Sequence, residues 1–232
     1  MSQILSCHKE DQYYPVLLRE ISGMPSLLYY RGNIEILNQY KNVAIIGSRT
    51  SSENGLHLSY ETARLAARKG LNIVNGLALG CDAEAIKGAL SVGGRCIAVL
   101  PCGLEQIQPR TNQHLAEEIL ENGGCLLSEY PQGTTLRKYH YVARDRIQSG
   151  LSHGVVIIEA EEKSGTMHTA DFARQQYKRL ACYASKLLQY SSGNKALESK
   201  SETNVLESLA GAEQFFDMVL EEPSCEQLRF EF

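Results

Sequence analysis

Short apolar runs alternate with helix-like segments from about residue 43 onward. Five runs are rich in Val, Ile and Leu and are bounded by Gly or Asn, as buried strands are: 43–47, 71–76, 96–100, 124–129 and 154–160. A weaker sixth run covers 179–184. Apolar residues recur with the helical period over 55–69, 82–91, 112–122, 140–151 and 166–177. This alternation predicts an α/β fold, with a mostly parallel sheet covered by helices on both faces.

The pattern divides the chain into three parts. We expect a lead-in segment over 1–34, the α/β core over 35–200, and an acidic C-terminal helix and tail over 201–232. The spacing predicts an amphipathic helix over about 203–221, ended by Pro223. Its apolar positions can cover the core or a partner, and they are Leu206, Leu209, Phe215, Phe216 and Val219.

Composition places the chain among ordinary globular proteins. It has 232 residues, 43% hydrophobic and 22% charged with mixed signs, which suffices for a sizeable core. No apolar run approaches the roughly 20 residues that span a bilayer. The N-terminus shows no basic region followed by an apolar stretch. We therefore expect a cytoplasmic protein with no membrane contact.

The cysteines and histidines give no pattern of a cross-linked or metal-binding site. The seven cysteines, at 7, 81, 96, 102, 125, 182 and 225, form no C-x-x-C pair, and several lie in apolar runs. We expect reduced thiols that serve as small core residues. The six histidines show no metal-ligand spacing, so we expect neither a metal nor a cofactor.

Charge is distributed unevenly along the sequence. The whole chain has a formal net charge of −4, but residues 201–232 hold eight acids and one base. The remaining 200 residues carry 22 bases and 19 acids, so the core is mildly basic. The simplest interpretation of the acidic segment is a solvated helix. The alternative is a segment that shields or mimics a nucleic-acid site.

The loops that follow the predicted strands hold the candidate chemistry, because ligands of open parallel sheets bind beyond the carboxyl ends of the strands. The first run leads into Gly47, Ser48 and Arg49, where small residues permit close approach and Arg offers a fork for phosphate. Arg110 and Asn112 follow the third run. Neither the G-x-G-x-x-G nor the P-loop pattern is present, so dinucleotide and P-loop functions lose their main support.

A basic cluster with interleaved aromatic residues covers 137–146. Arginine neutralises phosphate, and Tyr or His can stack on an unpaired base. The alternative is a solvated helix face. Because Arg49 and Arg110 are expected at the same sheet edge as Arg144 and Arg146, nucleic-acid binding is the favoured interpretation.

These stretches in this order resemble the DNA processing protein A (DprA/Smf) family over about residues 14–200. The matching stretches are YYRGN at 29–33, GSR at 47–49, IVNGLALGCDAEAIKGAL at 73–90, GGRCIAVLPCGLEQIQPRTN at 93–112, LLSEYPQGT at 126–134, RDRIQSGLSHGVVIIEA at 144–160 and SGTMHTADFA at 164–173.

The resemblance implies an extended Rossmann-like fold and non-catalytic binding of single-stranded DNA in natural transformation and recombination. It also implies loading of a RecA-type recombinase and a homodimer. The family's DNA-binding positions fall on Gly47, Ser48, Arg49, Arg110, Asn112, Arg144 and Arg146.

The sequence departs from the family pattern at several positions. Asp145 stands for the Asn of an R-N-R motif, Ile86 for a helix His, Gln108 for a Tyr, and Tyr183-Ala184-Ser185 for a V-P-G turn. An acidic helix is expected where the family has a winged-helix module.

Two other functions remain open. One is a sensor of a nucleotide-derived ligand in the same pocket. The other is a phosphoribohydrolase-like enzyme, whose loop reads G-G-x-G-T-x-x-E. Thr169 occupies the position of that acid, and cleavage through a cationic sugar centre needs the carboxylate, so hydrolysis is disfavoured.

Overall fold

Every predicted apolar run is a strand in the computed structural model, which describes residues 3–221. These strands are β3 (Asn42–Ile46), β4 (Asn72–Asn75), β5 (Cys96–Leu100), β6 (Cys125–Ser128), β7 (Gly154–Ile157) and β8 (Arg179–Tyr183). All six pair in parallel with their neighbours among them. The prediction of a mostly parallel α/β sheet is therefore confirmed.

The strand order identifies the place where a ligand is expected. The sheet runs β1-β2-β6-β5-β4-β3-β7-β8-β9. From β3 the chain builds outward through β4, β5 and β6, and then returns to place β7 on the other side of β3. Ligands of open α/β sheets bind beyond the carboxyl ends of the strands at such a reversal. The β3–β7 boundary is that reversal.

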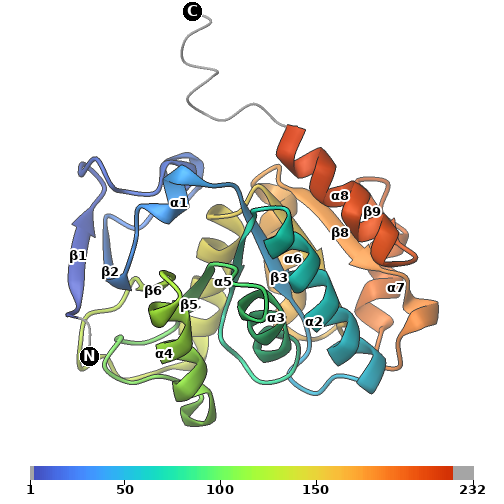
Figure 1. The fold of residues 1–232 in the computed structure, drawn as a ribbon, viewed down its shortest axis with the longest axis horizontal. Helices are drawn as coiled ribbons and strands as arrows, with labels where there is room; N and C mark the ends of the chain where they lie inside the picture. Colours follow the sequence, from blue (N-terminus) through green and yellow to red (C-terminus); the bar gives the residue numbers. More distant parts are fainter. Residues whose placement is uncertain (1–2, 222–232) are drawn as a thin grey trace, which may run out of the picture.

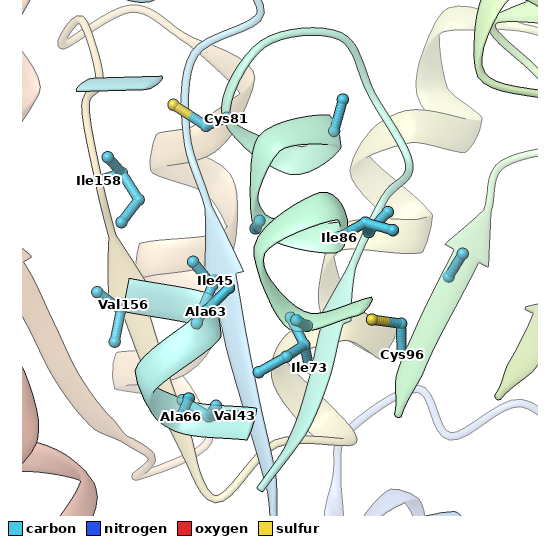
Figure 2. Close-up of a cluster of buried hydrophobic side chains, with 14 of the residues drawn as sticks. Val43, Ile45, Ala63, Ala66, Ile73, Cys81, Ile86, Cys96, Val156 and Ile158 are labelled. Atoms are coloured by element: carbon cyan, nitrogen blue, oxygen red, sulfur yellow. The ribbon is translucent and has the colours of Figure 1, made fainter. Parts of the chain in front are cut away.

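Helices cover both faces of the sheet (Figure 1). The helices α2 (Glu53–Arg68), α3 (Cys81–Leu90), α4 (Gln113–Glu121) and α8 (Leu209–Glu221) contribute to one apolar cluster, part of which Figure 2 shows. The helices α1 (Ile36–Gln39), α5 (Lys138–Gly150), α6 (Gly165–Gln175) and α7 (Ser192–Glu198) contribute to the other. Because side chains alternate along a strand, Val43 and Ile45 belong to the first cluster, and Ala44 and Ile46 to the second.

The lead-in segment contains two strands that the hydrophobic pattern did not predict. The strand β1 (Leu5–His8) pairs with β2 (Leu27–Gly32), which pairs with β6, and both pairings are antiparallel. Figure 1 shows this pair at one end of the sheet. Short turns of 3₁₀-helix complete the elements: Val16–Glu20, Arg110–Asn112 and Ser185–Leu187.

The predicted helix over 203–221 is wrong in its first part. Thr203–Leu206 form strand β9, which pairs in parallel with β8, and α8 begins only at Leu209. Pairing with an open sheet edge explains this outcome, since two β-branched residues, Thr203 and Val205, fit such an edge. The apolar side of α8 covers the core, because Phe215, Phe216 and Val219 are fully buried. Pro223 lies outside the described residues.

The six cysteines in the described part of the chain are free and buried, as expected for core thiols, and Cys225 lies outside it. Within residues 3–221, no helix is both long and apolar enough to cross a membrane.

Candidate functional site

A hollow of about 800 Å³ opens at the carboxyl ends of β3 and β7. We call it the central pocket. Its walls are the end of β3 and the loop after it (46–50), the side of α5 that carries Tyr141 and Arg144, and residues 164–166 at the start of α6. The volume lies within the usual range for binding sites of small molecules. The pocket therefore occupies the position that the strand order marks for a ligand.

Arg49 is an exposed cation in the lining of this pocket. It follows β3 directly, and its guanidinium lies over the ring of Tyr141 on α5, 4.9 Å from the ring centroid. Lys138, also exposed, lines the same wall. A guanidinium held against an aromatic face keeps its N–H donors available while losing less side-chain freedom on binding. Arg49 thus lies exposed beyond the carboxyl end of β3, and its role in binding an anion stays a prediction.

The backbone that carries Arg49 is fixed by hydrogen bonds within the chain. The Ser48 N–H donates to the Glu159 carbonyl at 2.7 Å, and the Ser48 carbonyl accepts from the Cys81 N–H at 3.1 Å. The Ser48 hydroxyl bonds the backbone of Thr50. Gly47 must be glycine here, since a Cβ would lie 2.5 Å from the Cys81 sulfur. The loop therefore presents the side chain of Arg49, while the N–H of Ser48 is already used.

Glu159, at the end of the β7 run, occupies the N-terminus of α2. Its carboxylate is fully buried and accepts hydrogen bonds from the Ser51 hydroxyl, from the Ser52 N–H at 2.7 Å, and from the N–H groups of Gln189 and Tyr190. Burial alone would raise the pKa of Glu159, but these donors outweigh it and hold the pKa below its ordinary value. A helix N-terminus that commonly binds phosphate is here filled by a side chain.

Arg144 lies in the wall of the central pocket but is buried, with 6% of the residue exposed. Its Nη1 donates to the Val99 carbonyl at 2.9 Å, and its Nε lies 3.0 Å from the Asp145 carboxylate. A Cβ on Gly76 would lie 1.6 Å from the guanidinium, so glycine is required beneath it. The expected arginine at the sheet edge is present, but its Nη1 and Nε contact groups of the protein.

Two buried carboxylates flank Arg144. Asp82 accepts from the N–H groups of Gly76 and Ala78, and it is 4% exposed. Burial raises the pKa of Asp82, against the opposing charge of Arg144. Burial likewise raises the pKa of Asp145 to about 6, with Arg144 opposing and Asp82 reinforcing the shift. Asp82 therefore holds the loop after β4 and also faces the guanidinium of Arg144.

Arg110 belongs to a separate hollow of about 430 Å³, next to Gln108. A narrow space of about 100 Å³ lies between the two, lined by Arg49 and Tyr141 on one side and by Gln108 on the other. Arg110 is exposed at this edge. Asn112 is buried and donates to the carbonyls of Leu77 and Ala78 at 3.0 Å each, so it holds the loop after β4.

Arg146 does not join the other arginines, contrary to the predicted convergence. It lies two positions from Arg144 on α5, which turns it toward a different face of the helix. Its Nη2 donates to the Glu129 carboxylate at 2.6 Å, and it does not line the hollows described above. The helical period alone predicts that Arg144 and Arg146 lie on different faces of the helix.

Sequence reasoning also missed Glu159 as an organiser of the site and did not single out Lys138 or Tyr141. Lys138 and Tyr141 lie three apart at the start of a helix, a spacing that places two side chains on one face. Glu159 carried a weaker signal, an acid at the carboxyl end of a central strand.

Comparison with known proteins places these features in a family. The family model described as DNA recombination-mediator protein A matches residues 6–216. Protein Smf of Synechocystis sp. is 40% identical over 169 residues, covering 72% of this chain and 42% of that protein. DNA processing protein DprA of Streptococcus pneumoniae is 39% identical over 166 residues, covering 72% and 58%. The chain spans about half the length of these curated relatives.

Comparison with solved structures finds similarity to the same family. The X-ray structure of DNA processing protein A from Streptococcus pneumoniae superposes with a TM-score of 0.82 at 33% identity, covering 90% of this chain and 73% of that one. A structure of DNA processing protein A from Helicobacter pylori, described as revealing a unique single-stranded DNA binding mode, gives 0.83 at 30% identity, with 95% and 99% coverage. A molybdenum cofactor carrier protein from Chlamydomonas reinhardtii, at 21% identity and a TM-score of 0.55, shares the fold.

Proposed function

Because this chain belongs to the DNA recombination-mediator protein A family, we propose that it binds single-stranded DNA and does so without catalysis, in DNA uptake and recombination. The observation that carries the proposal is Arg49, an exposed guanidinium stacked on Tyr141 at the mouth of the central pocket. A cation and an aromatic face side by side suit a nucleic-acid strand, which offers phosphates and unpaired bases together.

In this proposal the bound DNA strand follows the edge of the protein's sheet from Arg49 to Arg110. The narrow space between the two larger hollows shares Arg49 and Tyr141 with the central pocket and Gln108 with the hollow of Arg110. A chain of phosphates lying along this edge would meet Lys138, Arg49 and Arg110. Arg144 supports the wall from within rather than contacting phosphate, and Arg146 lies elsewhere.

We extend the proposal to the partners and the location. In it, a RecA-type recombinase is the partner in recombination, and the protein acts in the cytoplasm as a homodimer. Because the apolar side of α8 packs against the core, the interface between the two copies of the dimer lies on another surface. Light scattering during size-exclusion chromatography measures the mass directly, and a monomer at every concentration would remove the dimer from the proposal.

A salt titration tests strand binding. The affinity for a fluorescent single-stranded oligonucleotide should fall with salt, with a log–log slope of about −0.7 for each phosphate neutralised. Arg49→Ala/Arg110→Ala should weaken binding and flatten the slope. Arg68→Ala/Lys200→Ala is a control that removes two positive charges at exposed positions outside the hollows described above. Salt-independent binding, or a double variant that binds as the parent does, would contradict the proposal.

The size of the central pocket favours one second candidate, a sensor of a nucleotide-derived ligand. About 800 Å³ accommodates a mononucleotide. Competition separates the two functions: a mononucleotide that displaces the oligonucleotide at similar concentration supports the sensor. A phosphoribohydrolase-like enzyme has less support, because Thr169, in the position of the acid, lines the pocket without a carboxylate. Release of free base from mononucleotides would revive it.

A further inference from the structure

A single buried arginine faces two buried carboxylates beneath the central pocket. Asp82, Arg144 and Asp145 are 4%, 6% and 6% exposed, and all three line the pocket. With both acids ionised, the cluster carries one net negative charge. A wall of this sign is unexpected in a pocket whose rim, at Arg49 and Lys138, is positive.

The two carboxylates, Asp82 and Asp145, differ in the hydrogen-bond donors that the protein offers them. Asp82 accepts hydrogen bonds from the N–H groups of Gly76 and Ala78, in addition to the charge of Arg144. Asp145 has Arg144 as its donor, with Nε 3.0 Å from the carboxylate. Donors to the ionised form stabilise it, so Asp82 is better held as an anion. A proton that enters this cluster therefore goes to Asp145.

The charged groups around Asp145 come from several elements. Arg144 lies beside it on α5, Asp82 faces it from α3, and His168 faces it from α6. Arg49, Lys138 and Glu161 line the same pocket. Burial raises the pKa of Asp145 to about 6, so proton uptake requires only a modest further change.

We propose that Asp145 sets the affinity of the central pocket by taking up a proton when the phosphates of a bound strand enter. The inference rests on the proposed strand binding and deepens it. A phosphate brought near an ionised Asp145 is repelled, and protonation of that carboxyl leaves Arg144 and Asp82 as a neutral pair. Binding and proton uptake then favour each other by linkage.

The sign of the pH dependence follows. Phosphate binding raises the pKa of Asp145 above its value of about 6 in the free protein. Affinity therefore rises as the pH falls toward about 6, and it levels off below that pH, where Asp145 is already protonated. For a shift of one pKa unit on binding, the total gain is about tenfold.

The test compares Asp145→Asn with the parent, by fluorescence anisotropy with a labelled single strand at constant ionic strength. Asparagine matches the shape of the protonated acid. We expect the variant to bind about tenfold tighter than the parent at pH 8 and to show little change in affinity down to pH 6. Glu161→Gln changes the charge of the same pocket equally but should keep the pH dependence. His168→Gln, which removes the nearby imidazole, should keep it also.

The outcomes separate the inference from the proposed function. Absence of strand binding at every pH would overturn both. Strand binding whose affinity is independent of pH in the parent, or changes with pH equally in Asp145→Asn, would overturn the inference alone. Calorimetry in two buffers of different ionisation enthalpy gives a second readout, since proton uptake on binding should be present in the parent and absent in Asp145→Asn.

Discussion

The rim and the wall of the central pocket carry the same residue types in opposite environments. On the rim, Arg49 is exposed and rests on Tyr141. In the wall, Arg144 is buried and bonded to the Val99 carbonyl and to Asp145. The rim can meet a ligand at little cost to the fold, whereas the wall is part of the fold. The contacts of an arginine near a binding site, rather than its charge, therefore decide whether it binds a ligand or stabilises the fold.

The wall should give the largest effect on stability. Arg144→Ala leaves Asp82 and Asp145 buried without their cation, and removing one partner of a buried ionic group costs about 3–5 kcal/mol. The free energy of unfolding from denaturant titration measures this loss.

Two further variants control this result. Arg68→Ala, at an exposed position, should change the free energy of unfolding by less than about 0.5 kcal/mol. Adding Asp145→Asn to Arg144→Ala should recover part of the loss, because one uncompensated charge is removed. A loss below about 1 kcal/mol for Arg144→Ala would show that the wall does not depend on its arginine.

Glu159 extends the comparison to a buried residue with a negative charge, behind the loop that carries Arg49. Glu159→Gln weakens the hydrogen bonds that Ser51, Ser52 and Tyr190 donate, and we expect a loss of about 2 kcal/mol near neutral pH. The pKa of Glu159 is lower folded than its ordinary 4.5, so its contribution is present above that pH and is lost as the pH falls through the folded pKa.

Denaturant titrations at several pH values check this dependence. The difference between parent and Glu159→Gln should shrink below about pH 4.5. A difference that stays constant down to pH 3 would mean that the carboxylate charge does not stabilise the start of α2.

The sequence predicted the central strands and the helices between them because those segments bury continuous apolar runs. It missed β1, β2 and β9 for a physical reason. In β2 only Leu28 and Arg31 of six residues are buried. β1 exposes Leu5, Ser6 and His8, and β9 exposes Val205, so neither forms the apolar run of a buried strand. Both lie at sheet edges and are held by pairing with a neighbour, which a local pattern does not contain.

The candidate site was predicted only at its rim. Arg49 comes three residues after the end of β3, and Arg110 lies in the connection from β5 to α4, so chain direction alone places both beyond the carboxyl ends of the strands. The environment of Arg144 depends on Gly76, Val99 and Asp82, which come from a loop, a strand and a helix distant from it in the sequence. Burial of this kind arises from tertiary packing, and a basic cluster read along one helix cannot reveal it.

A substitution on the rim should lower the affinity for DNA and leave the stability of the fold nearly unchanged. Arg49→Ala removes an exposed cation, so the free energy of unfolding should change by less than about 0.5 kcal/mol. Affinity for a single strand should fall about tenfold, the effect of losing one charge-assisted hydrogen bond of about 1.5 kcal/mol. Anisotropy and denaturant titration on the same preparation measure both. A variant that loses stability instead would place Arg49 with the wall.

Substitution of Arg146 should have the smallest effect on DNA affinity. It tests whether the position of an arginine, and not only its charge, matters for binding. The guanidinium of Arg146 pairs with Glu129 away from the hollows that carry Arg49 and Arg110. This ion pair is partly exposed, so Arg146→Ala should lower the free energy of unfolding by about 1 kcal/mol or less. The affinity for a single strand should stay within about twofold of the parent, and the salt slope should not change. A loss of affinity as large as that of Arg49→Ala would mean that the strand leaves the sheet edge and crosses the far side of α5, since no phosphate along the proposed path reaches Arg146.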